Sequence, residues 1–589
     1  MAEKKEYTIS NIYQGGYSSL KPQYGDVFTG YRINPAKFGL TTDPRTANVL
    51  QDASTKLNVG AKQIELSAVQ PEVFESIPNQ QLKEINRLAK LTGVDVSVHG
   101  PIIEPSGLTR EGFSNANREA AERQMFSAVE RGHLVNPEGN VPITFHSSAI
   151  LPGEIPSKGK EIEEVLIINT ENGSFTKIPL KETKFPGDEG KKSVEKELKR
   201  INEDQWNNQL RQFEYYARMG AEAVSQSGIT NVIAEMRKKA GRDLTEDEQE
   251  MRSKYNYGTT FLNSSYHDLK QIFDTAYNNL PSNYKEDIEE FYKKIDSKAR
   301  KIKDNPSSSE NPLLMKQIID EGVEALKKLP APQLYKDLNE FSKEKTIETF
   351  ANVAFKAFTD KNVGNRDVNK TPIISIENPP AGGAFSTGGE LRDVVEKARQ
   401  KFVEIAKKEG IDESRAREIA AKLIGVTWDV GHINMMRKYG YESKDIVKES
   451  EKIAKLVKHV HLSDNFGMEH TELPMGMGNV PVKEILQKLG KEGFDAKKII
   501  EAGNWWQHFR TPPFKETLEA FGSPIYSMNM APYWNQNLGF QQDYYPGFGA
   551  MLPQINYETF GAGFSRLPAE LGGQTQGAQG SRMSGKGME

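Results

Sequence analysis

Short apolar runs that recur along the chain constrain its fold more than any other feature of the sequence. Several of these runs are rich in β-branched residues, end in polar or histidine-containing turns, and are separated by longer charged segments with helical periodicity. This alternation is typical of parallel sheets, and eight such strands can close into a (β/α)8 barrel. We therefore predict an α/β barrel, and an open doubly wound sheet is the alternative. The eight predicted strands are Phe38–Thr41, Gln63–Leu66, Val94–Val98, Pro142–Phe145, Ile373–Ile376, Val426–Trp428, Val457–Leu462 and Lys498–Ile500.

One connection between these strands is far longer than the others. About 220 residues separate the fourth predicted strand from the fifth, although connections within compact domains are mostly short. The helix before the fifth strand is recognisable at Lys345–Phe358, so we predict a large, mostly helical insertion at residues 151–342, after strand four. Within it, Val165–Leu180 is a predicted hairpin with an Asn-Gly turn, and Lys192–Gly220 and Tyr284–Lys303 are predicted helices.

The predicted organisation therefore has five parts. Residues 1–35 form an N-terminal arm, residues 36–150 and 343–522 form the two parts of the barrel around the insertion, and residues 523–589 form a flexible, low-complexity tail. Because the loop after strand four leaves the catalytic end of such a barrel, we expect the insertion to act as a lid or to contact substrate. Docking of a protein partner through the insertion or the tail, or a purely structural role of the insertion, is the alternative.

Composition excludes several classes of site. No stretch approaches the roughly 18 uninterrupted apolar residues of a membrane-spanning helix, and Met1–Thr8 is charged without an apolar signal core, so we expect a cytoplasmic protein with no membrane partner. The 589 residues include no cysteine, so a metal ion would have to be bound by histidine and carboxylate side chains. The formal net charge of -4 provides no global attraction to nucleic acid.

Histidines and carboxylates gather at the ends of the predicted strands. The chain has only nine histidines, yet His99 and His146 close strands three and four. Strand five ends at Glu377, a carboxylate that is costly to bury unless a cation or hydrogen-bond donors compensate it. Each residue alone is more often structural, but side chains from successive strand ends meet in one small volume of a closed barrel. Together they predict a metal centre.

The later strands add ligands of the same kind. Strand six ends at Asp429, and His432 follows three residues later. In the segment His459-Val460-His461 of strand seven, we expect only one ring to point into the barrel, and His461 is our choice. Strand eight ends at Glu501. Nitrogen and oxygen ligands suit Zn²⁺, Mn²⁺ or Fe²⁺ better than Mg²⁺ or Ca²⁺, and a metal-free polar cluster is the alternative.

These residues resemble the ligands of the endonuclease IV group of apurinic/apyrimidinic endonucleases (AP endonuclease family 2), within the xylose-isomerase-like TIM barrel superfamily. The resemblance covers residues 38–150 and 345–521 only. The metal ligands that it implies, in the family's order along the chain, are His99, His146, Glu377, Asp429, His432, His461 and Glu501.

The loop after strand seven departs from the family's pattern, which carries an Asp-x-His pair before a Gly-x-Gly turn. Here the turn is Gly476-Met477-Gly478, and His470 and Glu472 occupy the paired positions in reversed order. The second choice is Glu469 with His470, which keeps the order but loses the gap between the two ligands. The resemblance thus implies that the third metal is bound through this loop and His432.

The resemblance also implies an activity, the hydrolysis of DNA on the 5′ side of abasic sites in base excision repair. It implies up to three divalent metal ions, with Zn²⁺ as the first choice, bridged in part by Glu377. Glu377 and Glu501 are the candidate catalytic carboxylates. The main alternative within the superfamily is isomerisation or epimerisation of a sugar or sugar phosphate, in which Glu377, Asp429, His461 and Glu501 hold one metal ion and two opposed glutamates move a proton. A non-catalytic metal-bound scaffold is the second alternative.

Overall fold

The computed structural model describes residues 38–520, apart from residues 68, 181, 184–189, 192, 281, 307, 309, 503, 504, 506–508 and 510. The predicted arm at residues 1–35 and the predicted tail at residues 523–589 lie outside the described residues. The chain forms two compact units. The barrel unit comprises the described residues up to Ile162 and from Asn339 onward, and the helical unit is Glu163–Leu338.

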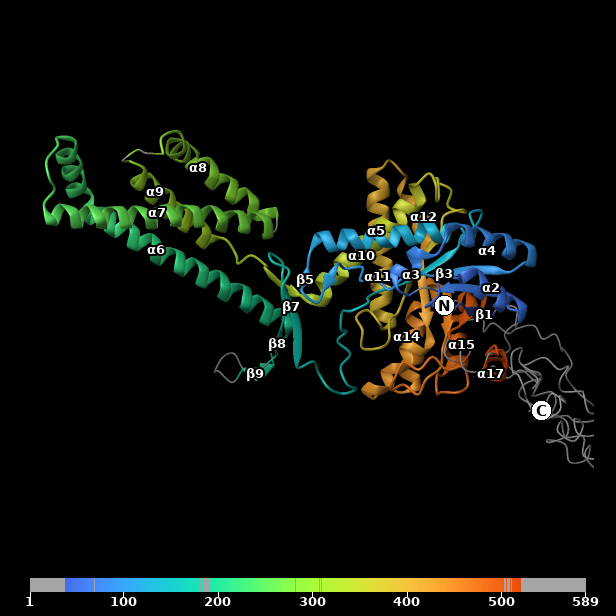
Figure 1. Cartoon of the computed structure of the whole chain (residues 1–589). Coiled ribbons are helices and arrows are strands. Elements are labelled where there is room, and N and C mark those ends of the chain that lie inside the picture. Colours follow the sequence, from blue (N-terminus) through green and yellow to red (C-terminus); the bar gives the residue numbers. More distant parts are fainter. Residues whose placement is uncertain are drawn as a thin grey trace, which may run out of the picture. The chain divides into compact units, whose positions relative to one another are not determined.

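Eight parallel strands close the barrel that the sequence predicts (Figure 1). Their order around the barrel is β1-β15-β14-β13-β12-β6-β3-β2, so each strand lies beside the strand that precedes or follows it among the eight. The predicted (β/α)8 fold is therefore confirmed. The strands are β1 Phe38–Thr41, β2 Gln63–Ser67, β3 Asp95–His99, β6 Pro142–His146, β12 Ile373–Glu377, β13 Ile424–Asp429, β14 Val457–Leu462 and β15 Lys497–Ile500.

The register of the strands brings their terminal polar residues to one level. Glu377, the last residue of β12, pairs with His146 at the end of β6. On the next two strands around the barrel, Asp429 at the end of β13 pairs with His461 of β14. Because all eight strands are parallel, their carboxyl ends lie at the same end of the barrel, and these side chains converge there.

Amphipathic helices cover the outside of the barrel. In α14, for example, Ile446 and Ile453 are buried seven residues apart, which is the spacing of one helical face. The start of α11 is fixed by a capping box in which Thr387 and Glu390 exchange side-chain and backbone hydrogen bonds. The helices longer than one turn are α2 Val49–Asn58, α3 Pro71–Ser76, α4 Asn79–Thr92, α5 Asn115–His133, α10 Leu338–Thr359, α11 Gly388–Lys408, α12 Glu413–Leu423, α13 Val430–Asn434, α14 Ser443–Ile453, α15 Val482–Asp495 and α17 Phe514–Ala520.

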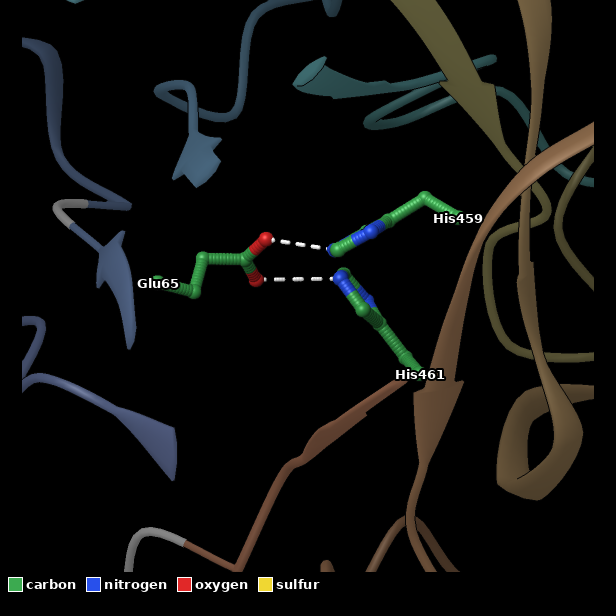
Figure 2. A group of neighbouring side chains, drawn as sticks. All are labelled: Glu65, His459 and His461. Carbon is green, nitrogen blue, oxygen red and sulfur yellow. Dashed lines mark hydrogen bonds and ion pairs between the residues drawn. The ribbon is translucent and has the colours of Figure 1, made fainter. Parts of the chain in front are cut away.

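The inside of the barrel is polar, unlike its helix-covered outside. His459 and His461 of β14 both face Glu65 of β2 across the interior (Figure 2). The expectation that only one of these two rings points inward was wrong. Successive side chains of a strand alternate between its faces, so residues two positions apart share a face. His459 is therefore an inward-facing neighbour of His461, and Val460 between them is the residue that faces the helices.

The helical unit has a core of its own. Its predicted hairpin is confirmed, since β7 Glu164–Asn169 pairs antiparallel with β8 Phe175–Pro179, and β11 Tyr335–Asp337 adds a third strand. The buried core includes Trp206, Phe273 and Ile318. A second small sheet pairs β9 Glu182–Thr183 with β10 Gly190–Lys191, and the long helices are α6 Val194–Lys239, α7 Glu246–Asn279, α8 Lys285–Asp304 and α9 Asn311–Lys328.

The helical unit is shorter than the predicted insertion of residues 151–342. Residues 151–162 belong to the barrel unit, where the Gly153 amide donates to the Gly382 carbonyl and the Lys158 amide donates to the Tyr439 carbonyl. Among the described residues, no helix combines the length and the apolar composition that crossing a membrane requires.

Candidate metal centre

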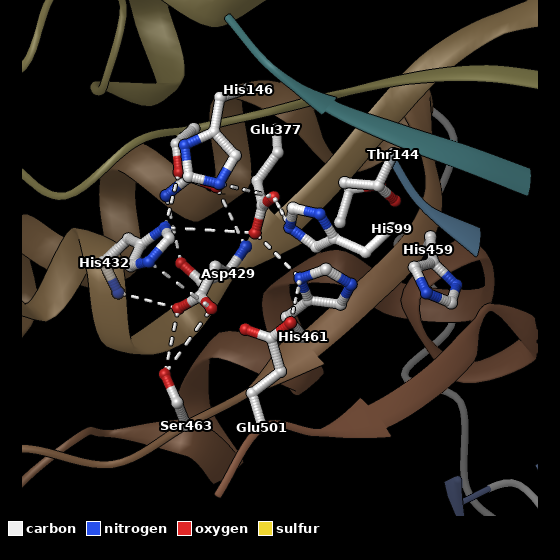
Figure 3. A network of polar contacts seen from close by, with 12 residues as sticks. His99, Thr144, His146, Glu377, Asp429, His432, His459, His461, Ser463 and Glu501 are labelled. Carbon is white, nitrogen blue, oxygen red and sulfur yellow. Dashed lines mark hydrogen bonds and ion pairs between the residues drawn. The ribbon is translucent and has the colours of Figure 1, made fainter. Parts of the chain in front are cut away.

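Glu377 stands at the middle of the polar cluster at the carboxyl ends of the strands (Figure 3). Its side chain is fully buried. One carboxylate oxygen, Oε2, lies 3.2 Å from His99 Nε2 and 3.3 Å from His146 Nε2. The other oxygen, Oε1, lies 2.8 Å from His461 Nδ1. The two oxygens of one side chain therefore face two different sets of potential metal ligands.

The first ligand group is His99, His146 and Glu377. Among the described residues, Glu377 Oε2 is buried and has no hydrogen-bond partner of acceptable geometry, although two ring nitrogens lie within 3.3 Å. Two ligands bound tetrahedrally to one zinc ion at about 2.0–2.1 Å are roughly 3.3 Å apart. The orphaned oxygen fits a cation beside it better than a set of hydrogen bonds. The ligand atoms of His99 and Glu377 also lie within 4.8 Å of each other and of His461.

The second ligand group is Glu377, Asp429, His461 and Glu501. Each of these residues offers one nitrogen or oxygen atom, and the four atoms lie within 4.8 Å of one another. His461 Nδ1 is 3.2 Å from Glu501 Oε1. Asp429 is held in place because its Oδ1 accepts a hydrogen bond of 2.7 Å from the His432 amide. Three carboxylates and one imidazole form a donor set suited to a divalent cation.

The third ligand group lies on the outer side of the same cluster. His432 Nε2 lies 2.8 Å from His470 Nε2, and Asp429 Oδ2 is 3.9 Å from His432 Nε2. Glu472 is half-buried and its charge contributes to the raised pKa of Glu501, whereas Glu469 is exposed. This geometry agrees with the first choice of His470 and Glu472, and the assignment to a metal stays a prediction.

The second nitrogen of two ligand histidines is held by a hydrogen-bond acceptor. His99 Nδ1 lies 2.8 Å from the Gly100 carbonyl, and His432 Nδ1 lies 2.7 Å from the Asn378 carbonyl. Because a carbonyl can only accept, the Nδ1 atoms carry the protons and the Nε2 atoms present lone pairs to the cluster. His461 is turned the other way, since its Nε2 faces Glu65 Oε1 at 3.0 Å, a charged contact without hydrogen-bond geometry. Such anchoring is typical of metal-binding histidines.

Burial and charge act against each other in this cluster. Burial opposes ionisation of Glu377, but His461, His146 and His99 lower the pKa of Glu377 well below its usual range. Burial raises the pKa of Glu501 well above its usual range and lowers the pKa of His146 to about 3. Burial also opposes protonation of His461, but Glu501 and Glu377 raise the pKa of His461 well above its usual value. The metal-free cluster therefore binds protons where divalent cations would compete with them.

Two residues at this centre were missed in the sequence. Glu65 and His459 form a buried group with His461. Glu65 stands in the middle of a predicted strand, and a carboxylate between apolar neighbours was a signal that the strand faces a polar interior. The structure brings together the side chains of the predicted His99, His146, Glu377, Asp429, His432, His461, His470 and Glu501.

Comparisons with known proteins support the barrel. A family model described as xylose isomerase-like TIM barrel matches residues 387–521. The uncharacterized protein MJ1311 of Methanocaldococcus jannaschii is 33% identical over 88 residues, which are 15% of this chain and 29% of that protein. The chain thus spans less than a third of that relative's length. A match to a crystal structure titled D-tagatose 3-epimerase-like protein covers 82% of this chain and 96% of that chain, at 14% sequence identity and a TM-score of 0.33.

Proposed function

We propose that this member of the xylose isomerase-like TIM barrel superfamily is a metal-dependent phosphodiester hydrolase that cleaves DNA 5′ to abasic sites in base excision repair, as the endonuclease IV group does. The proposed cofactors are up to three Zn²⁺ ions, and Mn²⁺ or Fe²⁺ are the alternatives. The proposed partner is therefore DNA that contains an abasic site.

The observation that carries this proposal is the presence of ligands on both sides of Glu377. A one-metal site needs only the second ligand group, on the Oε1 side. His99 and His146 on the Oε2 side would be superfluous there. The facing nitrogens of His432 and His470 would also be superfluous in a one-metal site. A centre with three ligand groups fits the binding of a phosphate and of the oxygens that attack and leave it.

The side chains of the centre have separate roles in this proposal. When bound, the metal ions would supply positive charge for the phosphate oxygens and lower the pKa of a water molecule. Glu377 fixes the relation between the first two ligand groups, because each of its oxygens faces one of them. His432 and His470 hold the outer group. The nearly complete burial of His99, Glu377 and His461 keeps bulk water from the inner ligands and strengthens their electrostatic interactions.

The rival function is sugar isomerisation or epimerisation, and one observation favours it. Glu377, Asp429, His461 and Glu501 lie close enough together to hold a single metal ion without the other histidines. Glu377 and Glu501 would then be the two glutamates that move a proton on the carbon next to a carbonyl. We rank this function second because it leaves the first and third ligand groups without a role.

The test is an abasic-site nicking assay on zinc-loaded protein, combined with zinc content per chain by elemental mass spectrometry. We expect close to three zinc ions per chain and incision that leaves a 3′ hydroxyl. His146→Ala should abolish nicking and remove zinc. His133→Ala is the matched control, because His133 is also buried but lies on α5 away from the centre. One zinc ion per chain without nicking, together with activity on a sugar, would favour the rival, and bound zinc with neither activity would favour a scaffold.

A further inference from the structure

A buried carboxylate lies behind the metal centre, between two histidines of the same strand (Figure 2). Glu65 Oε2 is 2.7 Å from His459 Nε2, and Glu65 Oε1 is 3.0 Å from His461 Nε2. The Ser97 hydroxyl donates a hydrogen bond of 2.8 Å to the same Oε2. Glu65, His459 and His461 have no exposed surface, and Ser97 is 1% exposed. The carboxylate therefore has its partners within the barrel interior and none in solvent.

These contacts determine how His461 can present itself to the centre. Ionised carboxylates only accept hydrogen bonds, and carboxylate oxygens lie beside both nitrogens of the His461 ring. Nδ1 is 2.8 Å from Glu377 Oε1 and 3.2 Å from Glu501 Oε1, and Nε2 is 3.0 Å from Glu65 Oε1. A metal ion in the second ligand group would take the place of the Nδ1 proton, and Glu65 would keep the remaining proton on Nε2. Without an acceptor at Nε2, the proton could move to Nδ1 and be donated to Glu377, and Nδ1 would no longer bind a metal.

We propose that Glu65 is a positioning residue for the metal centre, which fixes the tautomer and orientation of His461 so that Nδ1 binds the metal of the second ligand group. His459 and Ser97 hold the Glu65 carboxylate in the required orientation. This inference rests on the metal centre of the proposed function, but it does not depend on the substrate. Outer partners of metal-bound histidines typically change metal affinity by roughly 10- to 100-fold.

A different interpretation is that Glu65, His459 and His461 bind a metal ion of their own, since their ligand atoms lie within 4.8 Å of one another. His461 would then have to bind metal ions through both ring nitrogens and lose both of its protons. The distance of 2.7 Å between Glu65 Oε2 and His459 Nε2 is also that of a charge-assisted hydrogen bond. The hydrogen bonds of Glu65 Oε2 with His459 and Ser97 thus favour a supporting carboxylate, whereas Glu65 Oε1 and His461 Nε2 have no hydrogen-bond partner of acceptable geometry among the described residues. A metal titration separates the two interpretations.

The experiment is a chelator-competition titration of metal-free protein with Zn²⁺, repeated with Co²⁺ to record the absorption spectrum of the bound ion. The variants are Glu65→Gln, which removes the charge and keeps the size, and Glu65→Leu, which also removes the acceptor. Glu122→Gln is the matched control, because Glu122 accepts hydrogen bonds from Arg118 and Asn352 on the outside of the barrel. Thermal unfolding of each metal-free variant checks that it is folded.

We expect Glu65→Leu to weaken one zinc site by roughly 10- to 100-fold and to alter the cobalt spectrum, with a smaller effect of Glu65→Gln and none of Glu122→Gln. If Glu65→Leu does not fold, Glu65→Gln decides. Unchanged zinc affinities in a folded Glu65 variant would overturn the inference. An additional zinc site at Glu65 and His459 in the wild-type chain, which Glu65→Gln removes without weakening the site at His461, would also overturn it. Because the titration uses no DNA, a failure of the nicking assay alone would refute only the proposed function.

Discussion

Asp464 offers the sharpest test of how the loop after β14 is held. Its buried carboxylate accepts four backbone hydrogen bonds, from Gly476 and Gly478 on Oδ2 and from Asn465 and Val480 on Oδ1, at 2.8–3.0 Å. Asp464→Asn leaves one acceptor oxygen, so two amide donors would face an NH₂ group. Hydrogen bonds to a charged group contribute about 1.5–3 kcal/mol each, and the loss of two costs roughly 3–6 kcal/mol.

A cost of this size would release the loop that carries His470 from its position beside His432. We therefore expect Asp464→Asn to lose one zinc ion per chain, to keep the others, and to unfold at lower urea concentration. Elemental mass spectrometry and urea titration measure the two effects. Asp412→Asn is the control, because Asp412 caps helix α12, a position where asparagine is as good as aspartate. Asp464→Asn protein with the full zinc content and wild-type zinc affinity would refute this reasoning.

Three further predictions concern pH, the third ligand group and the helical unit. Burial opposes protonation of His461, but Glu501 and Glu377 raise the pKa of this residue, so zinc must displace a proton to bind. The affinity of the chain for zinc, titrated at several pH values, should therefore rise from about pH 6 to about pH 8. The same proton stabilises the metal-free fold below the pKa of about 6.5 that His461 has in the unfolded chain, and this stabilisation is lost as the pH rises through the pKa of His461 in the folded chain. The gain in Tm on zinc binding should therefore be larger at about pH 8 than at about pH 6. Glu472→Ala should lower the zinc content and Glu469→Ala should not, because only Glu472 is half-buried near the centre. Calorimetry should show two unfolding transitions, because the helical unit has its own core. Zinc should raise the transition temperature of the barrel unit only, and a single transition would contradict this prediction.

The barrel and most of the candidate ligands could be predicted because both depend on local patterns. In the run Ile373–Ile376, three of the four residues are isoleucine and only Ser375 is polar, which is typical of a buried parallel strand. The polar residue that follows such a run, Glu377, must then lie at the carboxyl end of a strand. Once eight strands are recognised, the closure of the barrel brings these terminal residues together without any further information from the sequence.

The support behind the ligands could not be predicted in the same way. Glu65 and His459 are 394 positions apart along the chain, and no local pattern links them. The wrong expectation for β14 also hid His459, because we assigned two rings on one face of a strand to opposite faces. The choice between Glu469 and Glu472 depends on the path of an irregular loop, which is set by the hydrogen bonds of Asp464 and has no sequence periodicity.

The polar interior of the barrel is itself an argument for bound cations. Glu65, Glu377 and Asp429 have no exposed surface, and moving a carboxylate from water into a protein interior costs several kcal/mol unless it is compensated. Imidazoles can compensate it only by taking up protons, yet burial lowers the pKa of His146 to about 3. The compensating protons lie instead on His461 and Glu501, whose pKa values are raised, for His461 by Glu501 and Glu377 against the effect of burial and for Glu501 by burial. Divalent cations would take the place of these protons, so metal binding and the stability of the barrel should be coupled.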